Sequence, residues 1–220
     1  MTPTDSSDTR AYFSPDIEAH LHKISSGLSH RYEGIFNKET IDLVVADSYG
    51  QLAEYATVSS HLPVLTERFA NDRLQAQAHT NGFVFTHTPQ VLFLCVHNAG
   101  RSQMAAAWMH HLSGGAVAVR SAGSAPSGTI NPVVTEAMAE VGIELTDAFP
   151  KPMTTDIVDA SDVIVSMGCG DACPVYPGKR YLDWELPDPA GLAIEQVRPI
   201  RDEIRGKVHA LIDELTPANR

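Results

Sequence analysis

The 220-residue sequence predicts an α/β fold: a parallel sheet with helices on both faces, preceded by a small three-helix bundle. Two observations carry this prediction. From residue 90 onward, short apolar runs alternate with segments of helical periodicity, which is typical of a parallel sheet covered by helices. Before residue 80, apolar residues recur three or four positions apart in three successive segments, as they do in amphipathic helices.

The N-terminal part begins with polar and acidic residues, and we expect a disordered tail over residues 1–13. Ser14 and Pro15 then supply an N-cap and a proline at the first helical position. The three helical segments predict a bundle over residues 14–80, with apolar positions Ile17, Leu21, Ile24, Leu28, Ile41, Val44, Val45, Tyr49, Leu52, Val64, Leu65, Phe69 and Leu74. A linker over 81–89 separates the bundle from a catalytic domain over 90–220, which we expect to fold without it.

The catalytic part alternates strands and helices. Its apolar runs predict strands at 90–95, 116–121 and 162–167, and its periodic segments predict helices at 101–113, 131–142, 154–160 and 195–215. Pro199 falls inside the last pattern, so that helix should start near it or be kinked there. Ligands of such folds bind beyond the carboxyl ends of the strands, which is where Cys95 lies.

Residues 91–102 give the clearest chemical signal. Four apolar residues lead into Cys95, and Arg101 follows at the start of a helix. The intervening backbone can curl so that its N–H groups point inward and, with the helix dipole and the guanidinium group, bind a tetrahedral oxyanion. The same field favours the thiolate of Cys95, a nucleophile at neutral pH. The residues expected to bind substrate are Val96, His97, Asn98, Ala99, Gly100, Arg101 and Ser102. The alternative is a buried cysteine beside an unrelated arginine.

Two more cysteines, Cys169 and Cys173, follow a later apolar strand. A zinc site would need about four ligands, and no histidine lies nearby. Two inert core residues are a second alternative. The glycines at positions 168 and 170 instead favour a mobile segment, as a relay of thiols between disulfide partners requires.

A loop carboxylate, Asp188, is held between two prolines. Loop aspartates are usually turn formers or helix caps. Here the carboxyl group could also protonate a departing oxygen. We expect Asp183 and Glu185 to be ordinary surface carboxylates.

These motifs together resemble a known family. The motifs concerned are the segment from Cys95 to Ser102 with Gln103, Met104 and Ala105 after it, the run Ser121, Ala122, Gly123 and Ser124, the cysteine pair, and Asp188 with Pro189. Taken together, they are similar to the motifs of thioredoxin-coupled arsenate reductases of the low-molecular-weight tyrosine phosphatase fold. The resemblance covers roughly residues 89–217. Phosphatases share the cysteine loop, whereas the added cysteine pair is specific to the reductases. The helical bundle resembles an N-terminal extension of actinobacterial members.

The resemblance implies a mechanism. Cys95 would attack arsenate, Arg101, Ser102 and the loop amides would hold its oxygens, and Asp188 would protonate the departing oxygen. Cys169 would then form a Cys95–Cys169 disulfide and release arsenite, and Cys173 would move it to Cys169–Cys173, where thioredoxin reduces it. A glutaredoxin or a small thiol such as mycothiol is the alternative donor. Phosphate or sulfate would mimic arsenate in the loop.

Other expectations concern partners and competing functions. Some relatives bind potassium through an acidic residue of the first helix, but Ala105, Ala106 and Ala107 stand here, so we expect no metal and no cofactor. The net charge of −11 argues against nucleic acid, and no apolar run would span a membrane, which favours a cytoplasmic protein. The resemblance to arsenate reductases implies a role in arsenic detoxification. The alternatives are a protein tyrosine phosphatase, or a chain whose bundle serves as an interaction or dimerisation module, with a homodimer possible.

Overall fold

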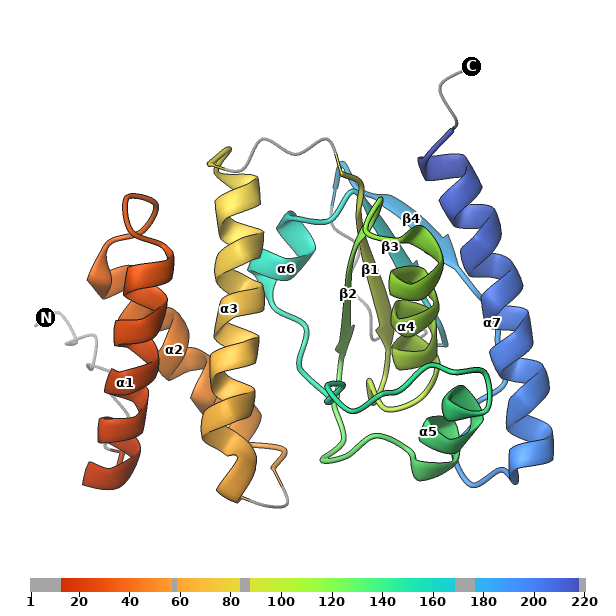
Figure 1. Cartoon of the computed structure of the whole chain (residues 1–220), viewed down its shortest axis with the longest axis horizontal. Helices are drawn as coiled ribbons and strands as arrows, with labels where there is room; N and C mark the ends of the chain where they lie inside the picture. The colour runs from red at the N-terminus through yellow and green to blue at the C-terminus, as the bar shows by residue number, and fades with distance from the viewer. Residues whose placement is uncertain (1–12, 57–58, 84–87, 169–176, 218–220) are drawn as a thin grey trace, which may run out of the picture.

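The computed structural model describes residues 13–56, 59–83, 88–168 and 177–217. Their centre is a four-stranded sheet in the order β2-β1-β3-β4, with all neighbouring strands parallel (Figure 1). The strands are β1 Gln90–Cys95, β2 Ala118–Gly123, β3 Val163–Ser166 and β4 Arg180–Asp183. This confirms the predicted fold class of a parallel sheet with helices on both faces.

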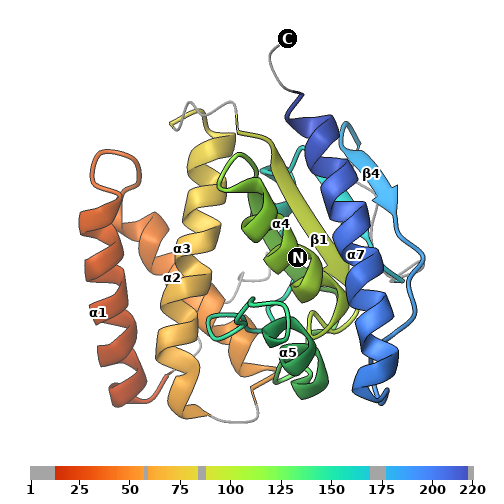
Figure 2. The ribbon, with the colours of Figure 1, turned by 45° about the vertical axis from the view of Figure 1, so that its right-hand side comes forward.

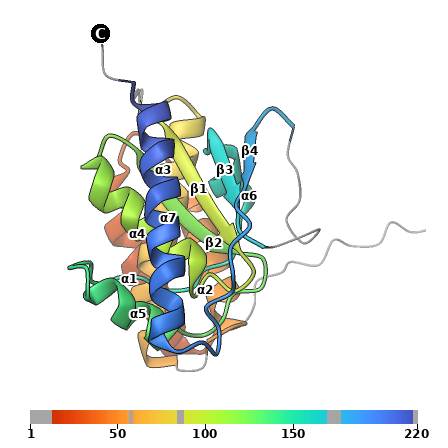
Figure 3. The same ribbon diagram turned by 90° about the vertical axis from the view of Figure 1, so that its right-hand side faces the viewer.

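Side chains of β1 alternate between the two faces of the sheet. Val91, Phe93 and Cys95 join the larger core, whereas Leu92 and Leu94 join a second core on the opposite face. The first face is covered by three helices that lie side by side in Figures 2 and 3, namely α4 Arg101–Ser113, α5 Pro132–Ala139 and α7 Ile194–Leu215. The second face is covered by α3 Leu62–Thr80 and the short α6 Thr155–Asp159.

Several predicted boundaries differ from the structure. The predicted strand 116–121 lies two residues later, because β2 pairs with β1 along the whole length of β1, up to Cys95 beside Gly123. The predicted helix 131–142 is shorter, because Asn131 is its N-cap and Gly142 has a φ of 78° that no helix residue adopts. Helix α7 begins five residues before Pro199 and contains it. Of the two expected outcomes, a helix start near this proline is therefore not found, and a kink there stays a prediction.

Sequence analysis missed β4. This strand lies at the edge of the sheet, and its residues are only partly buried or exposed. A four-residue segment that begins with Arg180 and ends with Asp183 has no apolar run to predict it. Its last residue, Asp183, was expected to be a surface carboxylate, and its side chain is exposed as predicted. Asp183 Oδ1 accepts a hydrogen bond of 2.6 Å from the Ser166 hydroxyl.

The N-terminal helices are α1 Pro15–Arg31, α2 Lys38–Ala53 and α3, with a short 3-10 helix η1 Ser59–His61 before α3. Most of the predicted apolar positions are buried here, but Val64 is 56% exposed, on the solvent side of α3. Phe13, predicted in a disordered tail, packs edge to face on Tyr49 with ring centroids 5.2 Å apart. The rest of that tail, residues 1–12, lies outside the described residues. No helix among the described residues combines the length and apolar character needed to cross a bilayer.

Helix α3 joins the bundle directly to the sheet. Its Phe69 and Ala76 are fully buried in the same core as Leu92, Leu94 and Ile164. A bundle that covers one face of the sheet shares its core with the catalytic part, and removing it would expose that face to water. This packing argues against the expectation that residues 90–220 fold on their own, and the division at 81–89 stays a prediction.

A polar network reinforces the same interface. The Arg73 guanidinium on α3 donates from Nε to Asp156 Oδ2 at 2.9 Å and from Nη1 to Asp47 Oδ2 at 2.6 Å. Burial raises the pKa of Asp156, but hydrogen bonds from Thr154 and Gln77 and the charge of Arg73 outweigh it, so this pKa lies below its usual value.

Asp156→Asn should therefore lower the free energy of unfolding by about 3 kcal/mol at pH 7, because it leaves the buried Arg73 with one partner fewer. The contribution of Asp156 is fully present above the ordinary aspartate pKa of about 3.9 and is lost as the pH falls through its lower pKa in the folded protein. Urea unfolding at pH 7 and at stepwise lower pH measures it.

The matched control is Asp147→Asn, which breaks the exposed pair of Asp147 Oδ1 with Arg68 Nη2 at 2.8 Å. Exposed pairs contribute about 1 kcal/mol or less. Equal destabilisation by the two variants would contradict the structural role given to Asp156.

Candidate active site

The loop between β1 and α4 begins after Cys95 and ends at Arg101, the first residue of α4. Its carbonyl oxygens are held from outside, by backbone N–H groups of Ser124, Ala125, Ser127 and Asn131 that donate to Cys95, Val96, His97 and Ala99, respectively. In a trans peptide the C=O and the following N–H point in opposite directions. The amides of these peptides therefore face the inside of the loop, together with the N-terminus of α4, as an anion requires.

Asn98 holds the loop together. It is fully buried, and its φ of 48° lies in the left-handed region, which asparagine tolerates better than most residues. Its Nδ2 donates to Ser102 Oγ at 2.9 Å, and its Oδ1 accepts from Gln103 Nε2 and from the backbone N–H of Lys151, both at 3.0 Å. Sequence analysis expected Asn98 to bind substrate, whereas in this geometry its side chain serves the loop's own network.

The thiol of Cys95 contacts one of these partners. Its Sγ lies 2.9 Å from Ser102 Oγ, and both residues are buried. Ser102 Oγ accepts from Asn98 Nδ2 and keeps its own proton, so the hydroxyl can donate that proton to the sulfur of Cys95 when the sulfur acts as a nucleophile.

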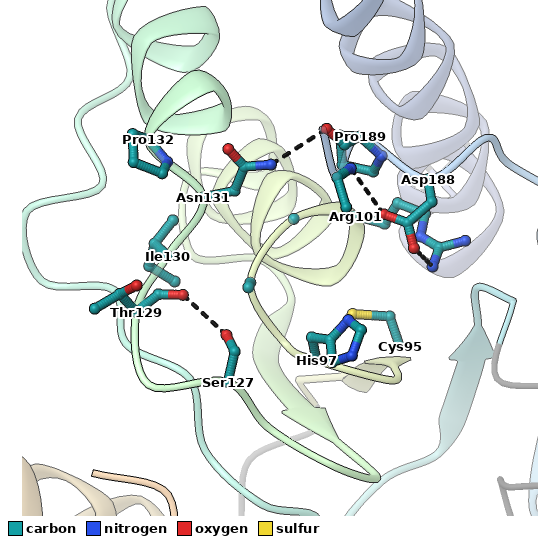
Figure 4. A pocket seen from close by; sticks show the side chains of 13 residues that line it. Cys95, His97, Arg101, Ser127, Thr129, Ile130, Asn131, Pro132, Asp188 and Pro189 are labelled. Atoms are coloured by element: carbon teal, nitrogen blue, oxygen red, sulfur yellow. Dashed lines mark hydrogen bonds and ion pairs between the residues drawn. The ribbon is translucent and has the colours of Figure 1, made fainter. Parts of the chain in front are cut away.

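Arg101 and Asp188 meet at the rim of the loop. Arg101 Nη2 lies 2.8 Å from Asp188 Oδ2, and its Nη1 donates to the carbonyl of Leu186 at 3.1 Å. The arginine side chain is 8% exposed and the aspartate side chain 47% exposed, so the carboxylate can be displaced toward water. Thus Cys95, Arg101 and Asp188, predicted from distant parts of the sequence, lie in one pocket (Figure 4).

This pocket has a volume of about 280 Å³, and part of its wall was missed by sequence analysis. Of the predicted residues, Cys95, His97, Ala99, Gly100, Arg101 and Asp188 line it, whereas Val96, Asn98 and Ser102 do not. The missed wall consists of Ser127, Thr129, Ile130, Asn131 and Pro132 (Figure 4). Asn131 caps α5 and also donates to the carbonyl of Pro189 at 3.2 Å, and the Asn-Pro helix start was the signal that marked this segment.

Gly168 touches the site from the segment just after β3. Its φ is 69°, and a Cβ at this position would lie 2.5 Å from Arg101 Nη1. A larger residue here would force the guanidinium to move from this position. Gly168 is also the last described residue before Cys169 and Cys173, both of which lie outside the described residues.

Comparisons with known proteins identify the family. Residues 90–219 match the model of low molecular weight phosphotyrosine protein phosphatases, which covers more than half of the chain. The chain belongs to this family. Residues 21–78 match the model of a protein-tyrosine-phosphatase-like N-terminal domain.

The resemblance to thioredoxin-coupled arsenate reductases with a helical extension is also confirmed. The chain is similar to a solved thioredoxin-dependent arsenate reductase of Corynebacterium glutamicum, with 45% identity and a TM-score of 0.81 over 94% of this chain and 100% of that one. It is 38% identical to arsenate reductase 1 of Bacillus cereus over 54% of this chain and 90% of the relative. It is 33% identical to the glutaredoxin arsenate reductase of Synechocystis over 58% of this chain and 98% of the relative.

The contact between Gly168 and Arg101 leads to a prediction. Gly168→Ala should weaken binding of inorganic phosphate by about tenfold or more, because the new methyl group displaces a guanidinium whose hydrogen bonds to an anion are each of that order. Titration calorimetry with phosphate measures the effect.

Gly142→Ala is the matched control, because Gly142 has a similar φ of 78° but open space where a Cβ would lie. It should strain the backbone and leave phosphate affinity unchanged. If both variants bound phosphate equally well, the contact with Arg101 would be irrelevant to the anion site.

Proposed function

We propose that this protein reduces arsenate to arsenite with Cys95 as the nucleophile, for arsenic detoxification in the cytoplasm. The observation that carries the proposal is the buried thiol of Cys95 in an amide-lined pocket with Arg101 and Asp188. The sequence of the same chain contains two further cysteines that a reductase requires. Similarity over nearly the full length to a thioredoxin-dependent arsenate reductase supports the same function.

In the first step arsenate enters the pocket and competes with Asp188 for Arg101. Its oxygens accept hydrogen bonds from the loop amides and the guanidinium group, which neutralise charge that develops as the sulfur attacks. The Cys95 sulfur forms a bond to arsenic, one arsenic–oxygen bond breaks, and the oxygen leaves as water with a proton from Asp188. Arsenic is still As(V) at this point.

The reduction needs two electrons, and they come from thiols. Cys169 attacks the sulfur of Cys95, the sulfur–arsenic bond breaks with its electron pair on arsenic, and arsenite leaves while a Cys95–Cys169 disulfide forms. Cys173 then attacks Cys169, which releases Cys95 as a thiol and leaves a Cys169–Cys173 disulfide. A reduced dithiol protein returns this disulfide to two thiols.

We take thioredoxin as that donor, because the relative that matches the chain over nearly its whole length is described as thioredoxin-dependent. The Synechocystis relative is described as a glutaredoxin enzyme, but it covers only the catalytic part. A glutaredoxin or a small thiol is therefore the second choice.

A phosphotyrosine phosphatase would use the same loop, and the family name raises that alternative. An aryl phosphate is held best where an aromatic side chain beside the acid stacks on its ring. Trp184, the aromatic residue near Asp188 in sequence, is buried against Phe93 with ring centroids 5.6 Å apart. The described residues that line the pocket include the apolar Ile130, Pro132 and Pro189 but no Phe, Tyr or Trp, so no aromatic side chain is there to stack on a phenyl ring, which favours an inorganic oxyanion.

A coupled assay tests the proposal. With arsenate, thioredoxin, thioredoxin reductase and NADPH, the wild-type protein should consume NADPH and release arsenite. Cys95→Ser should abolish turnover, because an alcohol is not ionised at neutral pH. Cys173→Ser should release one equivalent of arsenite and stop with Cys95 joined to Cys169, which disulfide mapping by mass spectrometry detects.

Two results would overturn the reduction mechanism. One is sustained turnover by Cys173→Ser, which would leave no role for a third cysteine. The other is an inactive wild-type protein in the coupled assay that hydrolyses phosphotyrosine efficiently, which would make it a phosphatase.

A further inference from the structure

We propose that the N-terminal helices belong to the catalytic machinery, because Asp72 on α3 is a positioning residue for the loop that holds Cys95. The path runs from Asp72 to the side chain of Lys151, from the Lys151 backbone to Asn98, and from Asn98 through Ser102 to the sulfur. The inference rests on the role proposed above for Cys95 as the nucleophile. The inference gives the N-terminal bundle a part in positioning Cys95 for that attack.

Lys151 connects the two halves of the path. Its Nζ donates to Asp72 Oδ2 at 3.2 Å and lies 4.6 Å from the centre of the Phe149 ring, and its side chain is 14% exposed. Its backbone N–H donates to Asn98 Oδ1 at 3.0 Å. One residue therefore contacts the bundle through its side chain and the catalytic loop through its main chain.

The segment around Lys151 is fixed from both sides. On the loop side, Gln103 Nε2 donates to the carbonyl of Phe149 at 3.0 Å, and the backbone N–H of Gly123 donates to the carbonyl of Lys151 at 2.9 Å. On the bundle side, Phe149 shares a buried core with Leu52 of α2 and Leu62 of α3. The N-terminal helices thus hold both Phe149 and Lys151 against the loop.

Asp72 also places a negative charge near two cationic side chains. It lines the same 500 Å³ cavity as Lys151 and Arg120, two cations that come from different elements. Burial lowers the pKa of Arg120, and the charges of Asp72 and Asp156 act against that shift. The described carboxylates of this cavity are Asp72, Glu144 and Asp147, and its histidines are His110 and His111. Asp72 is the carboxylate that contacts Lys151.

Loss of the Asp72 charge would leave Lys151 partly buried without this partner and beside Arg120. An ammonium group in that position gains free energy by moving toward water. Movement of its main chain would loosen the hydrogen bond to Asn98, and with it the alignment of Ser102 toward the sulfur of Cys95. The expected consequence is a less reactive thiol in a folded protein.

The experiment measures that thiol directly. The full-length protein is alkylated with iodoacetamide at pH 7, and the rate is followed by mass spectrometry on the peptide that contains Cys95. Asp72→Asn should slow alkylation of Cys95 roughly three- to tenfold, which lies within the roughly two- to thirtyfold range of coupling effects along such networks. Asp72→Glu should restore most of the rate, because it returns the carboxylate. Lys151→Gln, which breaks the pair from the other side, should slow alkylation as Asp72→Asn does.

The matched control is Asp147→Asn, which removes another ion pair of α3, the one with Arg68. Among the described residues, neither partner of that pair is hydrogen-bonded to Asn98. It should leave the alkylation rate unchanged at a comparable melting temperature. The proposal is overturned if Asp72→Asn alkylates at the wild-type rate, or if Asp147→Asn slows it equally. If Asp72→Asn does not fold, Lys151→Gln decides by the same criteria. Because no arsenate or thioredoxin is present, failure of the proposed function would appear separately, as a wild-type protein that reacts normally with iodoacetamide and releases no arsenite.

Discussion

The hydrogen bonds of Asn98 are the interaction on which the candidate site depends. A left-handed backbone at this residue turns the loop back on itself, and a buried amide with three hydrogen-bond partners compensates for that conformation. The end of β2 packs closely against the same loop, because a Cβ at Gly123 would lie only 2.6 Å from the carbonyl oxygen of Val96. Amides that face inward, a serine that faces the thiol, and a helix that starts at Arg101 all follow from this one turn.

The sheet fixes where this loop can be. Strand β1 is buried on both faces, and it delivers Cys95 to the carboxyl edge of the sheet, where its neighbours β2 and β3 also end. One face of β1 is covered by helices of the catalytic part and the other by α3 of the N-terminal bundle. The N-terminal extension therefore covers one side of the sheet's core. Its charged residues Asp72 and Arg73 form ion pairs with Lys151 and Asp156, respectively.

Sequence reasoning succeeded where local pattern and chemistry coincide. The apolar run 90–95 and the helix from Arg101 follow from residue order alone, and so does the placement of Cys95 and Arg101 at the two ends of one loop. Strand β4 could not be found, because an edge strand needs no apolar run. Val64 was wrongly assigned to the core of the bundle. Helix α3 packs on both the bundle and the sheet, so the residues it buries differ from those of a helix in an isolated bundle.

The roles of Asn98 and Lys151 were hidden for another reason. Their hydrogen bond joins residues 53 positions apart, and nothing in the sequence pairs them. The wall from Ser127 to Pro132 likewise becomes visible only once the backbone of that segment is seen to bind the loop carbonyls. Composition and periodicity report burial and local conformation, whereas these contacts depend on the way the strands order themselves in the sheet.

The measurement that tests the central role of Asn98 most directly compares two substitutions of it. Asn98→Gly keeps the left-handed backbone accessible and removes the hydrogen bonds, whereas Asn98→Ala removes both. If the hydrogen bonds control the site, both variants should lose the reactivity of Cys95 toward iodoacetamide at pH 7, by about tenfold or more. An Asn98→Gly protein that reacts as fast as the wild type would show that backbone conformation alone shapes the loop, and would contradict this account.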